Sequence, residues 1–199
     1  MAGWKFHKGQ AAGLPLENVD TDQLVPARFM STPRSQGYGG FLLYDLRYDE
    51  TDKLRVDIPF NSLAGASILI ARRNFGGGSS REAAVYALVD AGFHIVIAPS
   101  FGDIFVSNAI NNGLLPAQVT ETEADTLIAA APLSLSIDVL SQSISAEGYE
   151  FKFKLDPALC TKLVNGWDDV DLTASYEKKI RAFKKNRQLE APWLWTSTP

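Results

Sequence analysis

The sequence is poor in the residues that bind metals and form cross-links. Its 199 residues include one cysteine, Cys160, and two histidines, His7 and His94. A single cysteine excludes an internal disulfide and cannot supply the several thiolates that a zinc site or an iron–sulfur cluster needs. His94 lies in an apolar run and is interpreted as a core or strand-end residue rather than a catalytic base. Any cluster chemistry would have to come from another chain.

Long apolar runs and a net positive charge are also missing. No run approaches the roughly 20 apolar residues that cross a bilayer, and the first ten residues lack the apolar core of a secretory signal. We therefore expect a cytoplasmic protein without a membrane segment. The formal net charge of −4 argues against nucleic-acid binding, and the basic run at 178–187 is interpreted as the solvated face of a helix. A hydrophobic content of 46% over this length predicts one domain with a sizeable core.

A glycine-rich segment is the most informative feature that is present. Residues 72–82 read Arg-Arg-Asn-Phe-Gly-Gly-Gly-Ser-Ser-Arg-Glu and lie between an apolar run at 67–71 and a helical pattern. Such a turn exposes backbone N–H groups and the positive end of a helix dipole to an anion. Ser79 or Ser80 is expected to cap a helix that begins near Arg81. The alternative is a turn rich in glycine for geometry alone, but Arg81 offers a fork of donors suited to a carboxylate.

Several well-known site motifs do not fit this segment. It lacks the G-x-x-x-x-G-K-[ST] pattern and the spacing of the dinucleotide fingerprint, so nucleotide binding is not expected. The stretch from Gly78 to Glu82 has no glycine after its serines, so it is not the nucleophile elbow of a serine hydrolase.

The order of elements predicts an α/β fold. Buried strands at 66–71 and 94–98 alternate with helices at 80–92 and 103–112, which implies a parallel crossover. A helix at 121–131 is followed by period-two segments at 133–139, 142–146 and 149–153, which predict antiparallel hairpins. Helices are expected at 156–165 and 171–185, the latter with Leu172, Tyr176, Ile180 and Phe183 on one face.

The remaining segments give weaker signals. Residues 14–26 predict a turn that leads into one or two helical turns, and 54–60 could form a short strand. The segment 30–40 holds three glycines and a proline, which predicts a mobile loop that becomes ordered when a substrate binds. The tail at 191–196 carries two tryptophans and predicts docking, either onto this chain or onto a partner.

Four separated motifs, in this order and spacing, resemble one family over nearly the whole chain. They are Asn18-Val-Asp-Thr-Asp22 followed by Val25-Pro-Ala-Arg-Phe29, then Asn74 to Glu82, Ile97 to Phe105, and Asn112-Gly-Leu-Leu-Pro116. The chain resembles the small subunit of isopropylmalate isomerase (3-isopropylmalate dehydratase), which is related to the swivel domain of aconitase. The resemblance implies a swivelling β/β/α domain with a mixed sheet and flanking helices. We expect a single domain over 1–199, with a C-terminal helical extension at about 156–199.

The resemblance also implies a reaction and a partner. A small subunit of this kind closes over a large subunit that carries a [4Fe-4S] cluster, in a heterodimer or heterotetramer, and the substrate is a small hydroxy dicarboxylic acid. No metal is expected on this chain. Ser79 would be the catalytic base, and Ser80, Arg81, Gly77 and Gly78 would hold the substrate. The region of Arg28, Phe29 and Met30 would select the side chain of the substrate, with an alkyl group against the two apolar residues and a carboxylate on Arg28.

Two positions depart from the family pattern. Gly77 stands where the bacterial small subunits have cysteine, and Ala83 stands where they have histidine. Two alternatives to isopropylmalate isomerisation therefore stay open. One is a paralogue that acts on another 2-alkylmalate-type acid, such as dimethylmalate or methylmalate. The other is a non-catalytic partner of the large subunit.

Overall fold

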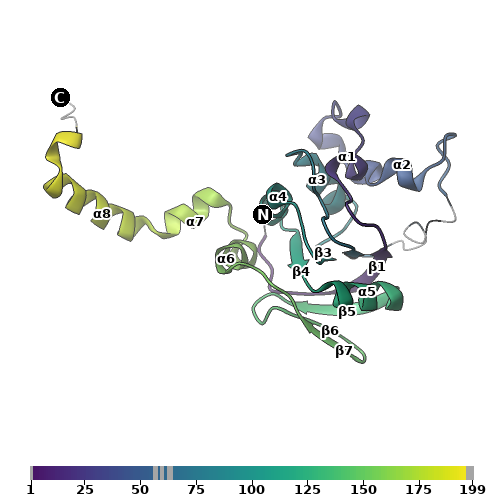
Figure 1. Ribbon diagram of the computed structural model, residues 1–199. Helices are drawn as coiled ribbons and strands as arrows, with labels where there is room; N and C mark the ends of the chain where they lie inside the picture. The colour runs from purple at the N-terminus through teal and green to yellow at the C-terminus, as the bar shows by residue number, and fades with distance from the viewer. Residues whose placement is uncertain (1, 56–57, 59–60, 62–64, 196–199) are drawn as a thin grey trace.

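The fold is built on one mixed sheet of seven strands. The computed structural model describes residues 2–55, 58, 61 and 65–195 (Figure 1). The strands lie in the order β4-β3-β2-β1-β5-β6-β7. They are β1 Phe6–Leu14, β2 Ile68–Ala71, β3 Ile95–Ala98, β4 Leu115–Gln118, β5 Leu133–Asp138, β6 Ser143–Ala146 and β7 Tyr149–Lys152.

Strand β1 joins a parallel half of the sheet to an antiparallel half. It pairs in parallel with β2, with Ala12 opposite Leu69, and antiparallel with β5, with Gly9 opposite Leu135. Strands β2, β3 and β4 continue the parallel half, and β5, β6 and β7 form the predicted hairpins. The expectation of an α/β fold with a mixed sheet and flanking helices is confirmed.

The helices have four to 14 residues, and α4 and α5 contact strands of the parallel half. They are α1 Thr21–Leu24, α2 Tyr44–Arg47, α3 Ala83–Asp90, α4 Asp103–Asn111, α5 Glu121–Ala130, α6 Pro157–Asn165, α7 Asp169–Ser175 and α8 Glu177–Glu190. Short 3-10 turns lie at η1 Ala27–Phe29, η2 Arg34–Gln36, η3 Gly39–Phe41 and η5 Pro192–Leu194. No helix in the described part of the chain is both long and apolar enough to span a membrane.

The sheet separates two hydrophobic cores, because alternate residues of a strand point to opposite faces. Leu69 and Ala71 of β2 belong to one core with α1 and α3, whereas Ile68 and Ile70 belong to the other with α5, α6 and the hairpins. All eight residues of β2 and β3 are buried, as expected for parallel strands covered on both faces. The loops that follow the parallel strands are thus held on a rigid base.

The segment 30–40 differs from the sequence-based prediction. It is packed rather than open: Tyr38 is buried, and its backbone N–H donates to Asp90 Oδ2 at 2.7 Å. Arg34 adds two hydrogen bonds to the same carboxylate, at 2.6 and 2.8 Å. Glycines and a proline suggested mobility, but an aromatic anchor and a long-range carboxylate give the segment fixed partners. All of these contacts lie within the chain, so the prediction of a loop without packed structure is wrong.

Three other expectations have different outcomes. The helical turn after residue 14 is α1, and Asp20 and Gln23 form a reciprocal capping box at its start. The helix expected at 171–185 is two helices, α7 and α8, which meet at Tyr176. The strand expected at 54–60 falls partly outside the described residues, and Leu54 forms an isolated bridge with Tyr48.

Candidate functional site

Three loop segments meet at the carboxyl ends of the parallel strands. The Gly76 N–H donates to the Val19 carbonyl at 2.7 Å, and the Thr21 N–H donates to the Gly77 carbonyl at 3.0 Å. On the other side of the glycine-rich turn, the Gly102 N–H donates to the Phe75 carbonyl at 2.9 Å. In parallel sheets, ligands commonly bind at this edge. The turn is therefore fixed in space by its backbone before any side chain is considered.

Gly76 is the residue that permits this close approach. Its φ is +72°, a left-handed conformation, and a Cβ at this position would overlap the ring of the buried Phe105. Gly78 is also left-handed, with φ +91°, but a Cβ there would meet nothing closer than the Asp20 Cβ at 3.5 Å. Gly77 has an ordinary φ, and its Cβ would lie 3.3 Å from Asn74 Oδ1. In the glycine-rich turn, a side chain is thus excluded most strictly at Gly76, and there is more room at Gly77 and Gly78.

The loop at 77–80 presents unused hydrogen-bond donors. Among the described residues, neither its backbone N–H groups nor the hydroxyls of Ser79 and Ser80 donate to a protein acceptor. Gly78, Ser79 and Ser80 are exposed. The Ser79 carbonyl, by contrast, accepts from Thr21 Oγ1 at 3.1 Å and from the Arg81 N–H at 2.8 Å. The carbonyls of Gly77 and Ser79 are thus held by the protein, whereas the donors of this exposed loop are left without a protein acceptor, an arrangement that suits an anion.

Arg81 closes the loop and forms an ion pair with Asp22 of α1. The Arg81 side chain is only about one quarter exposed. A carboxylate of the neighbouring segment therefore holds the guanidinium of the residue that follows the two serines.

Arg28 forms the second arginine–aspartate pair of this region. Its Nη1 donates to Asp45 Oδ2 at 3.0 Å, and Nη2 also contacts that carboxylate. The guanidinium lies 4.6 Å from the ring centroid of Phe29 and 5.4 Å from that of Tyr44. The hydrogen bonds from Arg28 lower the pKa of the Asp45 carboxyl, so the pair stays charged. Phe29 stacks on Phe41 at 4.2 Å between centroids.

A cavity of about 380 Å³ is lined in part by one carboxylate from each of the two ion pairs. These carboxylates are Asp22, which pairs with Arg81, and Asp45, which pairs with Arg28. The other lining residues are one further carboxylate and five apolar or amide residues: Asp20, Leu16, Val19, Gln23, Leu43 and Leu46. Arg81 and Arg28 themselves are not among the described residues that line the cavity. Met30 is exposed and lies on the same 3-10 turn region as Phe29. In the described part of the chain, no hydrogen bond, ion pair or ring contact joins the 28–30 segment directly to Ser79 or Ser80.

The sequence-based prediction of a serine cap is wrong. Helix α3 begins at Ala83, its N-cap position is Glu82, and no side chain caps it. The loop 77–81 is instead fixed by the backbone contacts to 19–21, so Ser79 and Ser80 are left with free hydroxyls. The sequence analysis also missed the roles of Asp22 and Asp45. Asp22 lies in the segment 14–26, for which the sequence predicts only a turn that leads into a helix. Nothing in the periodicity marks its carboxylate as the partner of Arg81, 59 residues away.

The described residues contain no group of three or more histidine, cysteine, aspartate or glutamate side chains arranged for a metal ion. Cys160 is half-buried, its Sγ lies 3.7 Å from the Val139 carbonyl oxygen, and burial raises the pKa of its thiol. A lone thiol of this kind does not fit the ligand set of an iron–sulfur cluster.

Comparison with known proteins agrees with this geometry. The family model of the Aconitase C-terminal domain matches residues 1–122. Among curated proteins, the 3-isopropylmalate dehydratase small subunit of Geobacillus sp. (strain WCH70) is 41% identical over 191 residues, covering 93% of this chain and 97% of the relative. That of Bordetella avium is 41% identical over 210 residues, covering 98% of this chain and 97% of the relative.

A solved structure gives the same answer. The crystal structure of 3-isopropylmalate dehydratase from Methanocaldococcus jannaschii matches with a TM-score of 0.67 and 28% identity, covering 90% of this chain and 99% of that chain. Identity above 40% over nearly the full length of several relatives leaves no doubt about kinship. The chain belongs to the 3-isopropylmalate dehydratase small-subunit family, a branch of the proteins with an aconitase C-terminal domain.

Proposed function

We propose that this chain is the small subunit of a heteromeric hydro-lyase that interconverts 2-isopropylmalate and 3-isopropylmalate by dehydration and rehydration. The reaction would serve leucine biosynthesis in the cytoplasm. The observation that carries the proposal is the exposed loop 77–81 at the carboxyl edge of the parallel strands, which offers donors without a protein acceptor and ends in Arg81. Family membership adds the reaction class, because the relatives are named as subunits of that dehydratase.

In the proposed reaction, Ser79 takes the proton. Its alkoxide would remove a proton from a carbon that bears a substrate carboxylate. The C–H electron pair would then form the double bond as the hydroxyl leaves the adjacent carbon. A serine alkoxide is a high-energy species, and it needs positive potential around it. The free N–H groups of the loop and the guanidinium of Arg81 supply that potential, and Ser80 would donate to the substrate.

The two arginines would bind the two carboxylates of the substrate. Each guanidinium has a planar fork that matches a carboxylate, and each is already placed by an aspartate of the chain. Phe29 and Met30, next to Arg28, would contact the alkyl group. Gly77 and Gly78 would let the substrate approach the backbone of the loop.

The cofactor would be carried by the partner. The [4Fe-4S] cluster of the large subunit would supply the Lewis acid that accepts the hydroxyl of the substrate. The lone, half-buried Cys160 supports this division, since the cluster needs several thiolates. The complex would be a heterodimer or heterotetramer of small and large subunits.

A second candidate substrate class is favoured by Gly77 and Ala83, the two departures from the family pattern. Ala83 is buried at the first turn of α3, so the position offers no polar group to the site. Another 2-alkylmalate-type acid, such as dimethylmalate or methylmalate, would use the same serine and arginines.

The test is a reconstitution. The chain is mixed with the cluster-bearing large subunit from the same genome, and the unsaturated diacid is followed by ultraviolet absorbance across a panel of 2-alkylmalates. Fastest turnover of 2-isopropylmalate supports the proposal. Fastest turnover of another malate replaces the substrate and keeps the mechanism. A complex that forms but turns over no acid contradicts the proposal and indicates a non-catalytic partner.

A further inference from the structure

The C-terminal arm, defined as residues 169–195, leaves the body of the protein. Figure 1 shows α7 and α8 extending away from the sheet, with α8 farther from it than α7. Every residue from Thr173 to Glu190 is exposed. None of the residues of the arm belongs to either hydrophobic core.

The tail of the arm folds back on the arm itself. The turn η5 contacts α8, Ala191 is buried, and Lys184 Nζ lies 5.4 Å from the ring centroid of Trp195. The described part of the tryptophan-bearing tail therefore does not dock onto the sheet body, which was one of the two outcomes expected from the sequence. Trp193 remains more than three-quarters exposed.

One face of α8 carries an apolar stripe with basic borders. Tyr176, Ile180 and Phe183 recur at helical spacing and are 47%, 46% and 69% exposed. Lys179 and Lys184 each lie four residues from a member of the stripe, so they border it. In total α8 has six basic and two acidic side chains, in a chain of net charge −4. The complementary surface would be an apolar groove bordered by carboxylates.

Helix α8 gains no stability from the two hydrophobic cores, because none of its residues belongs to them. Isolated helices shorter than about 12–15 residues are marginal in water, and α8 has 14 residues with one close ion pair, between Arg181 and Glu177 at 2.6 Å. Most of the stability of a protein helix comes from packing of an amphipathic face, and here the side chains of that face are 46–69% exposed. The alignment with the Bordetella avium relative covers 98% of this chain and so includes most of the arm.

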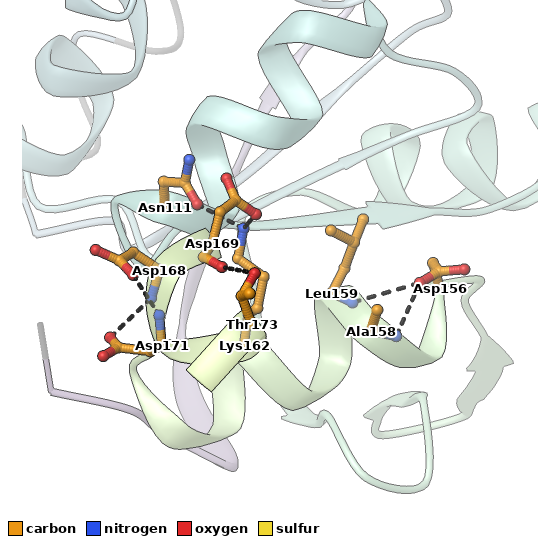
Figure 2. A network of polar contacts seen from close by, with 9 residues as sticks. All are labelled: Asn111, Asp156, Ala158, Leu159, Lys162, Asp168, Asp169, Asp171 and Thr173. Carbon is orange, nitrogen blue, oxygen red and sulfur yellow. Dashed lines mark hydrogen bonds and ion pairs between the residues drawn. The ribbon is translucent and has the colours of Figure 1, made fainter. Parts of the chain in front are cut away.

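The base of the arm is nevertheless fixed. Figure 2 shows Lys162 of α6 reaching between Asn111 of α4 and Asp169 at the start of α7. Its Nζ donates to Asn111 Oδ1 at 2.7 Å and to Asp169 Oδ1 at 2.6 Å, and its side chain is 2% exposed. Asp168 and Asp171 form a capping box one residue away. A buried ammonium that ties the body to the first turn of the arm sets the direction in which the arm leaves.

We propose that the C-terminal arm is a docking element for the large subunit, with Tyr176, Ile180 and Phe183 inserted in an apolar groove of that subunit bordered by carboxylates. We choose a groove bordered by carboxylates because Lys179 and Lys184 border the apolar stripe. Against a neutral groove, the charges of these two lysines would have no partner on the large subunit. This inference rests on the large-subunit pairing of the proposed function.

The test measures binding of the full chain to the large subunit. The double variant Ile180→Ser/Phe183→Ser removes the stripe, and Ala182→Ser/Leu189→Ser is its control on the opposite face of α8. We expect the first to raise Kd at least about tenfold and the second to change it by less than about twofold. The variant Lys179→Glu/Lys184→Glu is expected to slow association and to remove most of its salt dependence.

A second measurement does not depend on any variant. Amide hydrogen exchange is compared for the wild-type chain alone and in complex with the large subunit, and the amides of α8 are expected to slow while those of α5 stay unchanged. Equal exchange in α8, or equal affinity of the stripe variant, overturns the proposal. So does a stripe variant that loses only self-association or only binding to vesicles of anionic phospholipid. If the wild-type chain binds no large subunit at all, the proposed function fails as well.

Discussion

Asp22 forms an ion pair with Arg81, and this contact joins the first helical turn of the chain to the end of the glycine-rich loop. The two residues are 59 positions apart, and Thr21, next to Asp22, donates from its N–H to the Gly77 carbonyl and from its Oγ1 to the Ser79 carbonyl. An arginine placed in this way is orientated before a substrate arrives. Its fork can pass from one carboxylate to another with little rearrangement, which is the type of preorganisation that favours binding of an anion.

Ser79→Ala is expected to lower kcat by about 10²–10⁴-fold, the usual contribution of a positioned acid or base. The change removes a hydroxyl that has no protein partner among the described residues, while the Ser79 carbonyl keeps its contacts with Thr21 and Arg81. Folding and binding to the large subunit should therefore be unchanged. Steady-state turnover of the reconstituted enzyme is the measurement, with Ser80→Ala as the neighbouring control, for which a smaller loss is expected. Full activity of Ser79→Ala would sink the assignment of the base.

Arg81→Lys is expected to lower kcat/KM by about 10- to 100-fold, because an ammonium keeps the charge and loses the planar fork. A matched control exists nearby. Arg73 forms an ion pair with Glu17 at 2.7 Å and is more exposed than Arg81, so Arg73→Lys should change kcat/KM by less than about twofold. Both variants are assayed with the same large subunit and substrate. Equal losses in the two would show that charge near the loop, rather than the fork of Arg81, is what the reaction uses.

Gly76→Ala is expected to destabilise the chain by about 2–4 kcal/mol, from left-handed backbone strain and from overlap with the ring of Phe105. Gly77→Ala, one residue away, has an ordinary φ and meets only the Asn74 side chain at 3.3 Å. Its effect on the free energy of unfolding should stay within about 1 kcal/mol. Urea unfolding of both variants is the measurement. If Gly77→Ala were the more damaging change, the account of the loop given above would be wrong.

The sequence predicted the sheet well because its signals are local. Ile68 to Ala71 and Ile95 to Ala98 are short apolar runs between turn residues, and the alternating segment from Leu133 marks a half-buried strand. The start of α3 was placed too early because Ser79 and Ser80 are favourable capping residues. Long-range hydrogen bonds fix the loop outside the helix instead, from Gly76 to Val19 and from Thr21 to Gly77 and Ser79.

The limits of prediction lie in contacts between distant residues. The packing of the segment 30–40 depends on Asp90, and the placement of Arg81 depends on Asp22. Neither partner can be chosen from composition or periodicity, since several other carboxylates are as close in sequence. The division of the last helical pattern at Tyr176 was missed for a related reason, because the apolar period runs through the junction without a break.

The free energy of unfolding is expected to fall as the pH drops below about 6.5, because His7 has a lowered pKa in the folded chain. Burial, and secondly the charge of His94, lower the pKa of His7 in the folded chain below its ordinary value of 6.5. The unfolded chain therefore binds more protons than the folded chain between the two pKa values, and the free energy of unfolding rises with pH across that window. The His7 ring lies 4.6 Å from that of His94, and His7 Nε2 is 2.8 Å from Ser67 Oγ.

His7→Gln should remove this part of the pH dependence, because glutamine keeps a polar group and does not titrate. The measurement is urea unfolding between pH 5 and pH 8, and the variant is expected to lose less stability than the wild-type chain as the pH falls. His94→Gln is the matched control, and it should relieve the pH dependence only in part, since burial is the larger cause of the lowered pKa of His7. A slope between pH 5 and pH 7 that is the same in His7→Gln and in the wild-type chain would assign the effect to other groups.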